Sequence, residues 1–441
     1  MREFNREIQA RLLQWKNGPN RKPLVLQGAR QVGKTHLLKQ LGNTAFTEMA
    51  YFNFEEQPTL KQLFENTKDV QHIIQNLSLV YGRPILPNTT LLVLDEVQEC
   101  NAALNTLKYF YENAPQYAVA AAGSLLGITL STPGSFPVGK VHFMEVYPLS
   151  FMEYLQAANP TLHQYVQQLT TLAPMPDIFF TALQAHFRHY SISGGMPEAM
   201  ATLLPTVDVQ ATESILKDIL QAYSLDFAKH APTKEIARIN HVWQSIPAQL
   251  ARENKKFLYQ TVKTGARARE YEDALLWLLQ AGLIYKVPLC KKPHLPLSAY
   301  DDLSAFKIYL ADVGLLRKLA QLPPNALENT QSLFTEFKGA LAENYVLQSL
   351  ARQFEVAPRY WTSAGNAEVD FLLHYKNEVL PCEVKAGLNT RSQSLSVYQS
   401  AYQPPLRIRY SLKNLDYNDG LLNIPLFLAD RTQQFLVAAG L

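Results

Sequence analysis

Residues 28–35 combine two glycines, a lysine and a threonine in the spacing GxxxxGK[ST]. Gly28 and Gly33 allow a tight loop whose backbone N–H groups turn toward phosphate oxygens. Lys34 supplies a positive charge for the β- and γ-phosphates, and Thr35 offers a hydroxyl to Mg²⁺. Because an apolar strand-length segment precedes the loop and a helical segment follows it, we predict a site for ATP and Mg²⁺. The predicted nucleotide-binding residues are Gly28, Ala29, Arg30, Gln31, Val32, Gly33, Lys34 and Thr35.

Two neighbouring acids, Asp95 and Glu96, follow a run of four apolar residues. A buried strand that ends in acids places them at the ligand-binding edge of a parallel sheet. We predict that Asp95 holds the hydration shell of Mg²⁺ and that Glu96 polarises the attacking water. In a plainer interpretation, both acids only cap the next helix.

Polar residues end two other predicted strands. Ser124 follows an alanine-rich strand and could contact the γ-phosphate or the attacking water. Asn53 ends a short aromatic strand and could hydrogen-bond Glu96. For both Ser124 and Asn53, a role in a turn is equally consistent with the sequence.

A second group of chemically capable residues lies near the C-terminus. Glu343 is on a predicted helix, Asp370 on a predicted strand, and Glu383 and Lys385 on the next strand. Alternation along a strand puts Glu383 and Lys385 on one face, and Asp370 can meet them if the two strands pair. Asp370 and Glu383 could then hold a divalent metal that polarises a phosphate, with Glu343 completing the site and Lys385 orienting a water. Such a site would suit a metal-dependent nuclease. Alternatively, the segment could keep the fold of a nuclease but only recognise its partner, without cleaving a phosphodiester bond.

Basic residues concentrate in the middle of the chain. Residues 251–300 contain nine Lys or Arg and four acidic residues. Helical stretches at 234–250 and 267–281, followed by two strand-like segments, predict a winged helix. Cations at 252–269 would flank the helix that enters a DNA groove, so we predict DNA contact there. A solvated face or a protein contact is the alternative.

The composition limits the class of protein. Hydrophobic residues make up 47% of the 441 residues, which excludes a disordered or collagen-like chain. A net charge of +3 does not indicate a nucleic-acid binder, so such a role must come from a local patch. The three cysteines form no CxxC pair, which argues against a disulfide scaffold or zinc ribbon. No apolar run suits a signal peptide or membrane span, so we expect a cytoplasmic protein with no membrane partner.

The elements that must position these residues indicate an α/β chain. Apolar strands alternate with helices in the first part, which predicts a parallel sheet. In the last part, a helix, three strands, a helix and a strand follow one another. The predicted domains are 1–205 with a helical lid at about 150–205, 206–325 as a winged helix, and 326–441 as a restriction-endonuclease-like α/β domain. Residues 194–197 and 312–314 are predicted turns.

Six stretches together carry a family resemblance: GARQVGKT, YFNFEE, LLVLDEVQ, AGSLLG, KVHFMEVYPLSFMEYL and YSISGGMPEAM. The chain resembles prokaryotic AAA+ ATPases whose C-terminal half carries a domain of unassigned function similar to PD-(D/E)xK nucleases. The resemblance implies the usual roles for Lys34, Thr35, Asp95 and Glu96, and a sensor role for Ser124.

The chain departs from this family at one point. Many members have Gly-Arg where this sequence has Gly139 and Lys140, so no arginine finger is assigned. Arg188 is a candidate, although an exposed helical arginine is the simpler interpretation.

Three functions remain open from the sequence. The first is an ATP-binding and ATP-hydrolysing protein that couples nucleotide state to DNA engagement. The second is a nucleotide-dependent regulatory switch that binds a protein and whose nuclease-like domain is silent. The third is an ATP-gated, metal-dependent nuclease. The sequence also leaves a homo-oligomer open.

Overall fold

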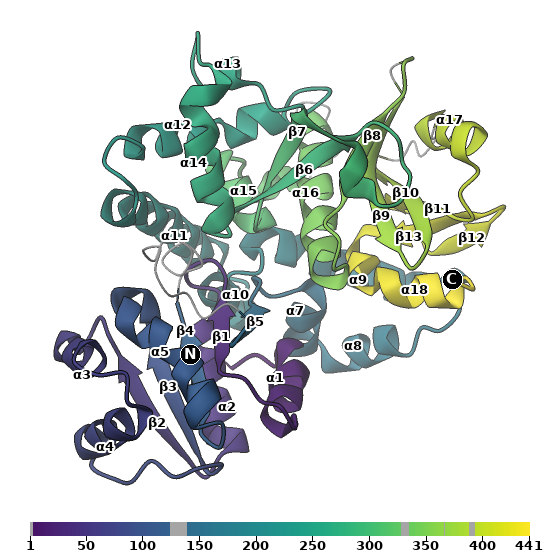
Figure 1. Ribbon diagram of the computed structural model, residues 1–441. Coiled ribbons are helices and arrows are strands. Elements are labelled where there is room, and N and C mark those ends of the chain that lie inside the picture. Colours follow the sequence, from purple (N-terminus) through teal and green to yellow (C-terminus); the bar gives the residue numbers. More distant parts are fainter. Residues whose placement is uncertain (1–2, 124–138, 328–334, 366, 388–392) are drawn as a thin grey trace. The chain divides into compact units, whose positions relative to one another are not determined.

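The computed structural model describes residues 3–123, 139–327, 335–365, 367–387 and 393–441 (Figure 1). The chain divides into two compact units. The N-terminal unit comprises residues 5–148 and 280–282, and the C-terminal unit comprises the first residues, 149–279 and 283–441. Among the described residues, no helix is both long and apolar enough to cross a membrane.

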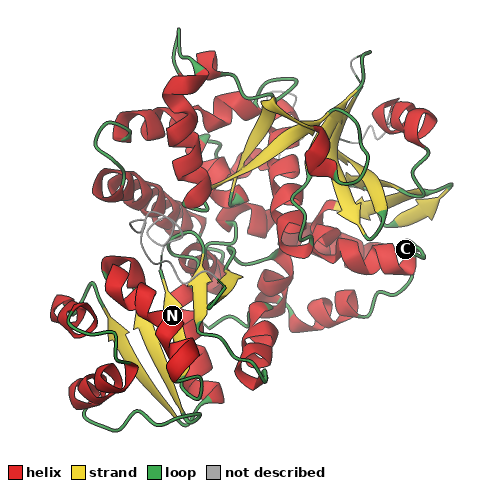
Figure 2. Ribbon diagram, viewed as in Figure 1, coloured by secondary structure: helices red, strands yellow, loops and turns green. Residues whose placement is uncertain are grey.

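The N-terminal unit is built on a five-stranded sheet in the order β2-β3-β4-β1-β5, with helices flanking it (Figures 1 and 2). Every pairing in this sheet is parallel, as predicted. Its strands are β1 (Leu24–Gln27), β2 (Glu48–Asn53), β3 (Thr90–Asp95), β4 (Ala118–Ala122) and β5 (His142–Glu145). Its helices are α1 (Ile8–Asn17), α2 (Lys34–Ala45), α3 (Lys61–Glu65), α4 (Val70–Tyr81) and α5 (Asn101–Asn113), with short 3-10 turns η1 (Pro58–Leu60) and η2 (Val97–Glu99).

The core of this unit follows from the hydrophobic pattern. All six residues of β3 are buried, and the apolar face of α4 packs against the same core. Asp69 caps the start of α4 through the Gln71 N–H, and Gly82 ends the helix with φ of 77°. Parallel pairing brings the carboxyl ends of β1 and β3 to one edge, on either side of β4.

The C-terminal unit begins with helices. They are α7 (Phe151–Ala158), α8 (Pro160–Gln167), α9 (Asp177–Ser193), α10 (Pro197–Thr206), α11 (Val209–His230), α12 (Ile236–Leu250), α13 (Tyr259–Val262), α14 (Ala268–Gln280) and α15 (Val313–Leu319), with 3-10 turns η3 (Leu297–Tyr300) and η4 (Pro324–Leu327). Residues 150–205, where a helical lid was predicted, lie in this unit, which begins again at residue 149. The physical reason is aromatic packing, because Phe151 and Phe180 both contact Phe427 near the C-terminus.

An eight-stranded sheet, ordered β12-β13-β11-β10-β9-β8-β6-β7, follows in the same unit (Figure 2). The strands are β6 (Ile284–Cys290), β7 (Asp301–Leu310), β8 (Arg359–Thr362), β9 (Glu368–Tyr375), β10 (Glu378–Lys385), β11 (Arg407–Ser411), β12 (Asp416–Asn418) and β13 (Leu421–Pro425). The accompanying helices are α16 (Thr335–Gln353), α17 (Gln393–Tyr402), η6 (Leu426–Arg431) and α18 (Thr432–Ala438).

The predicted winged-helix ribbon is part of this larger sheet. The two strands β6 and β7 pair antiparallel, as a wing would. However, β6 also runs parallel to β8, with Leu289 opposite Tyr360. The predicted domain boundary between 325 and 326 therefore falls between strands of one continuous sheet.

Candidate functional site

The loop between β1 and α2 has the tight backbone that its two glycines predict. Gly28 has φ of 148°, and a Cβ placed there would lie 2.2 Å from the Val146 carbonyl oxygen. Gly33 has φ of 95° and directly precedes α2. A side chain at Gly28 would collide with backbone, so this position requires glycine.

The side chains of Lys34 and Arg6 donate hydrogen bonds to backbone carbonyls of this loop. The Lys34 ammonium donates to the carbonyl oxygens of Gly28 at 2.9 Å and Ala29 at 2.7 Å. The buried Arg6 guanidinium donates to the Val32 carbonyl at 3.0 Å and to the Tyr147 carbonyl at 2.7 Å. Sequence reasoning did not find Arg6, because it lies outside the motif and no spacing pattern marks it.

The end of β3 meets the start of α2, as the phosphate-loop prediction requires. Asp95 is buried, and its Oδ2 accepts hydrogen bonds from the Thr35 hydroxyl and the Tyr51 hydroxyl, each at 2.7 Å. Burial and the Asp95 carboxylate raise the pKa of Tyr51 well above its usual value. Tyr51 was not predicted as a site residue, because it lies inside a strand and no motif marks it.

Glu96 lies beside Asp95 in a left-handed backbone conformation, with φ of 50°. Its side chain accepts a hydrogen bond from the Gln98 amide. Asn53 does not bond Glu96; its Oδ1 accepts the N–H groups of Glu55 at 2.9 Å and Glu56 at 3.2 Å. The turn role is therefore the one that Asn53 takes. Ser124 lies outside the described residues.

The second predicted group forms in the C-terminal unit. Strands β9 and β10 pair antiparallel, with Phe371 opposite Cys382, so the condition under which Asp370 can meet Glu383 and Lys385 holds. The Val384 N–H donates to Asp370 Oδ2 at 2.8 Å. Glu383 and Lys385 share a face and form an ion pair at 2.5 Å.

Three charged residues that the sequence did not assign to this group also belong to it: Lys255, Lys307 and Glu368. Glu343 is buried, and its Oε1 contacts the Lys255 ammonium at 2.6 Å while its Oε2 accepts the Tyr309 hydroxyl at 3.0 Å. The fully buried Lys307 pairs with Glu368. We call this set the carboxylate–lysine cluster. Its charged members are Glu343, Glu368, Asp370, Glu383, Lys255, Lys307 and Lys385.

The charged groups of the cluster shift one another's pKa values. Withdrawal from water and the nearby Glu343 carboxylate raise the pKa of Asp370 to about 7. Burial also raises the pKa of Glu383 above its ordinary value, although Lys385 acts in the opposite direction. Burial lowers the pKa of Lys307, but the surrounding carboxylates outweigh this effect and raise its pKa.

The carboxylates predicted to hold a metal are engaged by other side chains in this structure. Within the described part of the chain, no group of three or more His, Cys, Asp or Glu side chains is arranged to hold a metal ion. Both oxygens of Glu343 are taken by Lys255 and Tyr309, and Glu383 is paired with Lys385. With these oxygens engaged, the donor set does not fit a divalent cation, and Asp370 and Glu383 as metal ligands stay a prediction.

Three family models match consecutive parts of the chain. Residues 20–155 match a family described as "AAA domain". Residues 184–326 and 338–428 match two domains of unknown function, DUF8612 and DUF4143. The N-terminal part of the chain is thus similar to an AAA-type P-loop domain. A comparison with curated proteins gave no match.

Three solved structures that are similar to this chain share little sequence with it. A Walker-type ATPase of Pyrococcus abyssi is 14% identical with a TM-score of 0.45, over 72% of this chain and 96% of the other. Cdc6p from Pyrobaculum aerophilum is 12% identical with a TM-score of 0.28, over 73% and 94%. AMPPCP-bound DnaA from Aquifex aeolicus is 12% identical with a TM-score of 0.29, over 62% and 86%.

Neither position considered for an arginine finger stands out. Within the unit that holds the AAA-type domain, Lys140 pairs with Glu112 at 3.2 Å and lies over the Tyr111 ring. Arg188 is exposed on α9 of the C-terminal unit, where its Nε contacts the Gln184 carbonyl at 3.5 Å. Lys140 is thus occupied by a neighbouring acid.

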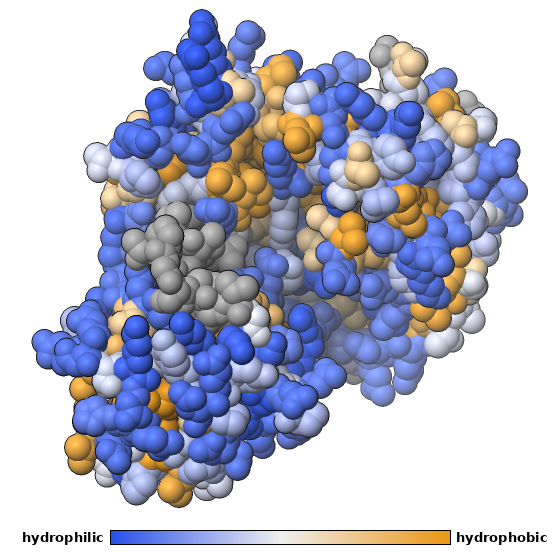
Figure 3. Space-filling model, viewed as in Figure 1, coloured by the Kyte–Doolittle hydropathy of each residue, from blue (hydrophilic) through white to orange (hydrophobic). Residues whose placement is uncertain are grey.

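The basic segment 252–269 is accessible. The surface over α13 and the adjoining loops is hydrophilic in the view of Figure 3. Lys256 is half-buried, while Arg252, Lys263, Arg267 and Arg269 are exposed. Among the residues that the structure describes, none of these five cations forms an ion pair with a carboxylate.

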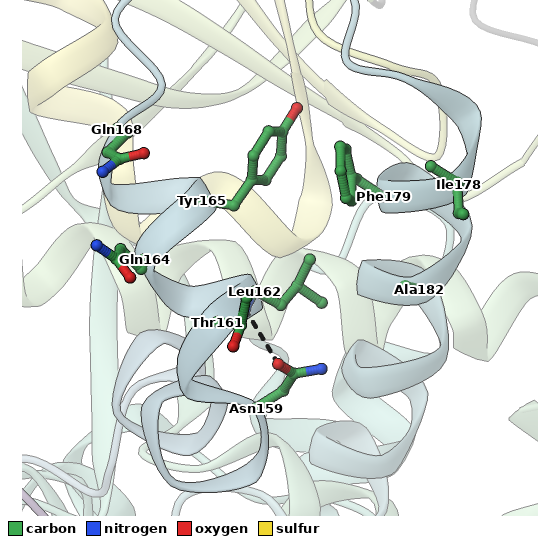
Figure 4. Close-up of a pocket in the computed structure, with 9 residues that line it drawn as sticks. All are labelled: Asn159, Thr161, Leu162, Gln164, Tyr165, Gln168, Ile178, Phe179 and Ala182. Atoms are coloured by element: carbon green, nitrogen blue, oxygen red, sulfur yellow. Dashed lines mark hydrogen bonds between the residues drawn. The ribbon is translucent and has the colours of Figure 1, made fainter.

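A cavity of about 660 Å³ lies between α8 and α9 of the C-terminal unit (Figure 4). Tyr165 and Phe179 pack across it, with ring centroids 4.3 Å apart. Its lining residues are Asn159, Thr161, Leu162, Gln164, Tyr165, Gln168, Ile178, Phe179 and Ala182. Because none of these side chains carries a charge, the cavity is not suited to a phosphate group or a metal ion.

Proposed function

We propose that the AAA-type domain binds ATP with Mg²⁺ and hydrolyses the nucleotide. The observation that carries this proposal is the 2.7 Å contact between the Thr35 hydroxyl and the Asp95 carboxylate, beside the Lys34 ammonium. These groups come from two segments that are 60 residues apart in the chain. Their meeting at the carboxyl edge of a parallel sheet supports a phosphate and magnesium site.

The residues divide the chemistry among themselves. Thr35 and Asp95 offer the hard oxygen ligands that Mg²⁺ prefers, and bound Mg²⁺ would neutralise phosphate charge. Lys34, which now bonds two loop carbonyls, would donate to a phosphate oxygen instead. Glu96, oriented by Gln98, would accept a proton from the attacking water.

Substitution of Lys34 tests this assignment. Lys34→Ala removes the ammonium from the loop and should reduce ATP turnover at least 100-fold, about the effect of losing one preorganised charge. Lys68→Ala is the matched control, because Lys68 is an exposed lysine of the same unit. Turnover would be measured as phosphate release from ATP. Equal rates for Lys34→Ala and Lys68→Ala would exclude this site as the source of hydrolysis.

We further propose that nucleotide state controls how residues 252–269 engage DNA. The support is the group of five cations described above, whose charged groups form no ion pair with a carboxylate among the described residues. Phosphate contacts of this kind release counterions, so binding should weaken steeply with salt. Replacing Lys263 and Arg267 by alanine should lower the slope of log affinity against log salt by about two.

The DNA test needs a control that removes the same number of charges. Lys217→Ala with Lys234→Ala serves, because both lysines are exposed and lie outside the basic segment. Binding to a short duplex would be measured by fluorescence anisotropy at several salt concentrations. Identical salt slopes for the two double variants would reject the segment as the DNA contact.

A protein-binding switch is the second candidate. It is favoured by Glu272 and Asp273, which lie beside Arg269 on the exposed face of α14. Carboxylates on that face would repel DNA phosphates but suit a partner with mixed charges. Absence of DNA binding at low salt, in protein that still turns over ATP, would favour this candidate.

A further inference from the structure

Two of the three lysines of the carboxylate–lysine cluster lie outside the predicted nuclease-like segment. Lys255 lies in the loop after α12, and Lys307 lies on β7. Their carboxylate partners, Glu343 and Glu368, lie 88 and 61 residues further along the chain. The cluster therefore joins the middle of the chain to α16 and β9.

Burial makes these pairings obligatory. The side chains of Lys307 and Lys255 are 0% and 15% exposed, and that of Glu343 is 6% exposed. A carboxylate in such surroundings is strongly unfavourable unless an opposite charge and hydrogen bonds satisfy it. Glu343 receives both from Lys255 and Tyr309, so it needs no further cation.

We infer that the lysine ammonium groups take the charge-neutralising role of a divalent metal in this cluster, and that Lys255 keeps such a metal out. A metal bound by Glu343 would have to displace Lys255 from Oε1. It would also lie near Lys307, whose charge is felt at both Glu343 and Asp370. Repulsion between these cations opposes metal entry. The cluster is then an ionic clamp between segments, with no metal-dependent cleavage.

Manganese binding without nucleotide tests this inference. Bound Mn²⁺ would be counted by electron paramagnetic resonance in the full chain and in Asp370→Asn. We expect the same stoichiometry in both, because the native cluster holds no metal. Mn²⁺ that the native protein binds and Asp370→Asn loses would overturn the inference. The measurement uses no nucleotide, so its outcome is separate from that of the proposed ATP turnover.

Removing the clamp lysine gives a second, positive test. Lys255→Met leaves Glu343 without its ammonium and should raise the affinity for Mn²⁺ at least tenfold, in a manner that adding Asp370→Asn abolishes. The matched control is Lys256→Met on the same loop, which should behave as the native protein. No gain in Lys255→Met would contradict the role of Lys255. If Lys255→Met does not fold, the comparison of native protein with Asp370→Asn still decides.

Discussion

Arg6 is the residue whose contacts most directly brace the nucleotide loop. Its guanidinium bonds the Val32 carbonyl inside the loop and the Tyr147 carbonyl beyond β5. Arg6→Ala removes both bonds, and each bond to a charged donor contributes about 1.5 to 3 kcal/mol. We expect the KM for ATP to rise about tenfold or more, because the loop is no longer held ready for phosphates. Steady-state ATPase kinetics would check this.

The control for Arg6 is Arg11→Ala, an exposed arginine on α1. It removes the same charge without touching the loop. If the two variants share one KM for ATP, the contacts of Arg6 do not position the loop for nucleotide.

Asp312 provides a pH-dependent prediction. Its carboxylate accepts the N–H groups of Gly195 at 2.6 Å and Leu315 at 3.0 Å, and burial raises its pKa. The folded protein therefore holds this proton more tightly than the unfolded chain. Its contribution to the free energy of unfolding is complete below the unfolded pKa, near 3.8, and is lost as pH rises through the raised pKa. Asp312→Asn cannot titrate, so the advantage of the native protein over this variant should be largest at low pH.

Urea denaturation of the native protein and Asp312→Asn at pH 4.5 and pH 7.5 would measure this difference. An advantage that grows with pH would mean that the Asp312 pKa is lowered in the folded state, contrary to the effect of burial.

A site whose residues are close together in the sequence could be predicted. A contact between residues that only folding brings together could not. The loop at 28–35 is one contiguous motif, so its spacing alone predicted a strand, a turn and a helix, and all three are confirmed. The partnership of Lys255 and Glu343 spans 88 residues and leaves no periodic signal. The same limit explains why a metal was expected near Asp370: the sequence displayed the carboxylates but not the lysines that neutralise them.

At the scale of elements, the strength of the apolar pattern explains why β3 was predicted while β5 and β12 were not. All six residues of β3 are buried, which makes a central parallel strand visible in the sequence. By contrast, β5 buries Met144 alone, and all three residues of β12 are exposed. These two strands form because a neighbouring strand offers hydrogen bonds, which is information that lies elsewhere in the chain.

The two predicted turns at 194–197 and 312–314 pack directly against each other. A Cβ at Gly194, where φ is 62°, would lie 2.0 Å from Asp312 Oδ1, and one at Gly314 would lie 2.4 Å from the Gly194 nitrogen. The glycines thus permit the turn after α9 to pack directly on the start of α15. From the sequence each turn could be predicted separately, but their meeting could not.

The start of α7 supplies a prediction at this scale. Asp430 in η6 accepts the N–H groups of Phe151 at 2.9 Å and Met152 at 3.4 Å, so it ties the C-terminus to the first turn of α7. Asp430→Ala removes this acceptor from both N–H groups, and the Ser150 capping box does not replace it, because it serves the N–H groups of Ser150 and Glu153. The substitution should lower the free energy of unfolding by about 1 to 3 kcal/mol. Chemical denaturation would measure the loss. Asp416→Ala, at an exposed position on β12, should change it by less than about 0.5 kcal/mol, and an equal effect of both variants would rule out the tie.

At the scale of the whole molecule, the chain holds two compact units where three domains were predicted. The helices at 150–205 lie in the C-terminal unit, where their aromatic side chains pack against Phe427. The parallel pairing of β6 with β8 joins segments 71 residues apart at Leu289 and Tyr360. Neither composition nor linker signals could reveal such a pairing, because nothing in the sequence of either strand indicates which strand lies beside it.

The proposed coupling between nucleotide and DNA can only be tested on the whole chain. If DNA at residues 252–269 changes the ATPase cycle, duplex DNA should raise ATP turnover severalfold at low salt. The stimulation should fade as salt rises, since phosphate contacts weaken steeply with ionic strength. Phosphate release would be measured with and without DNA across salt concentrations, for the native protein and for the variant lacking Lys263 and Arg267. Stimulation that survives both high salt and loss of these two cations would show that DNA acts elsewhere on the molecule. If DNA has no effect on turnover, the protein-binding switch is the better explanation of the charged face of α14.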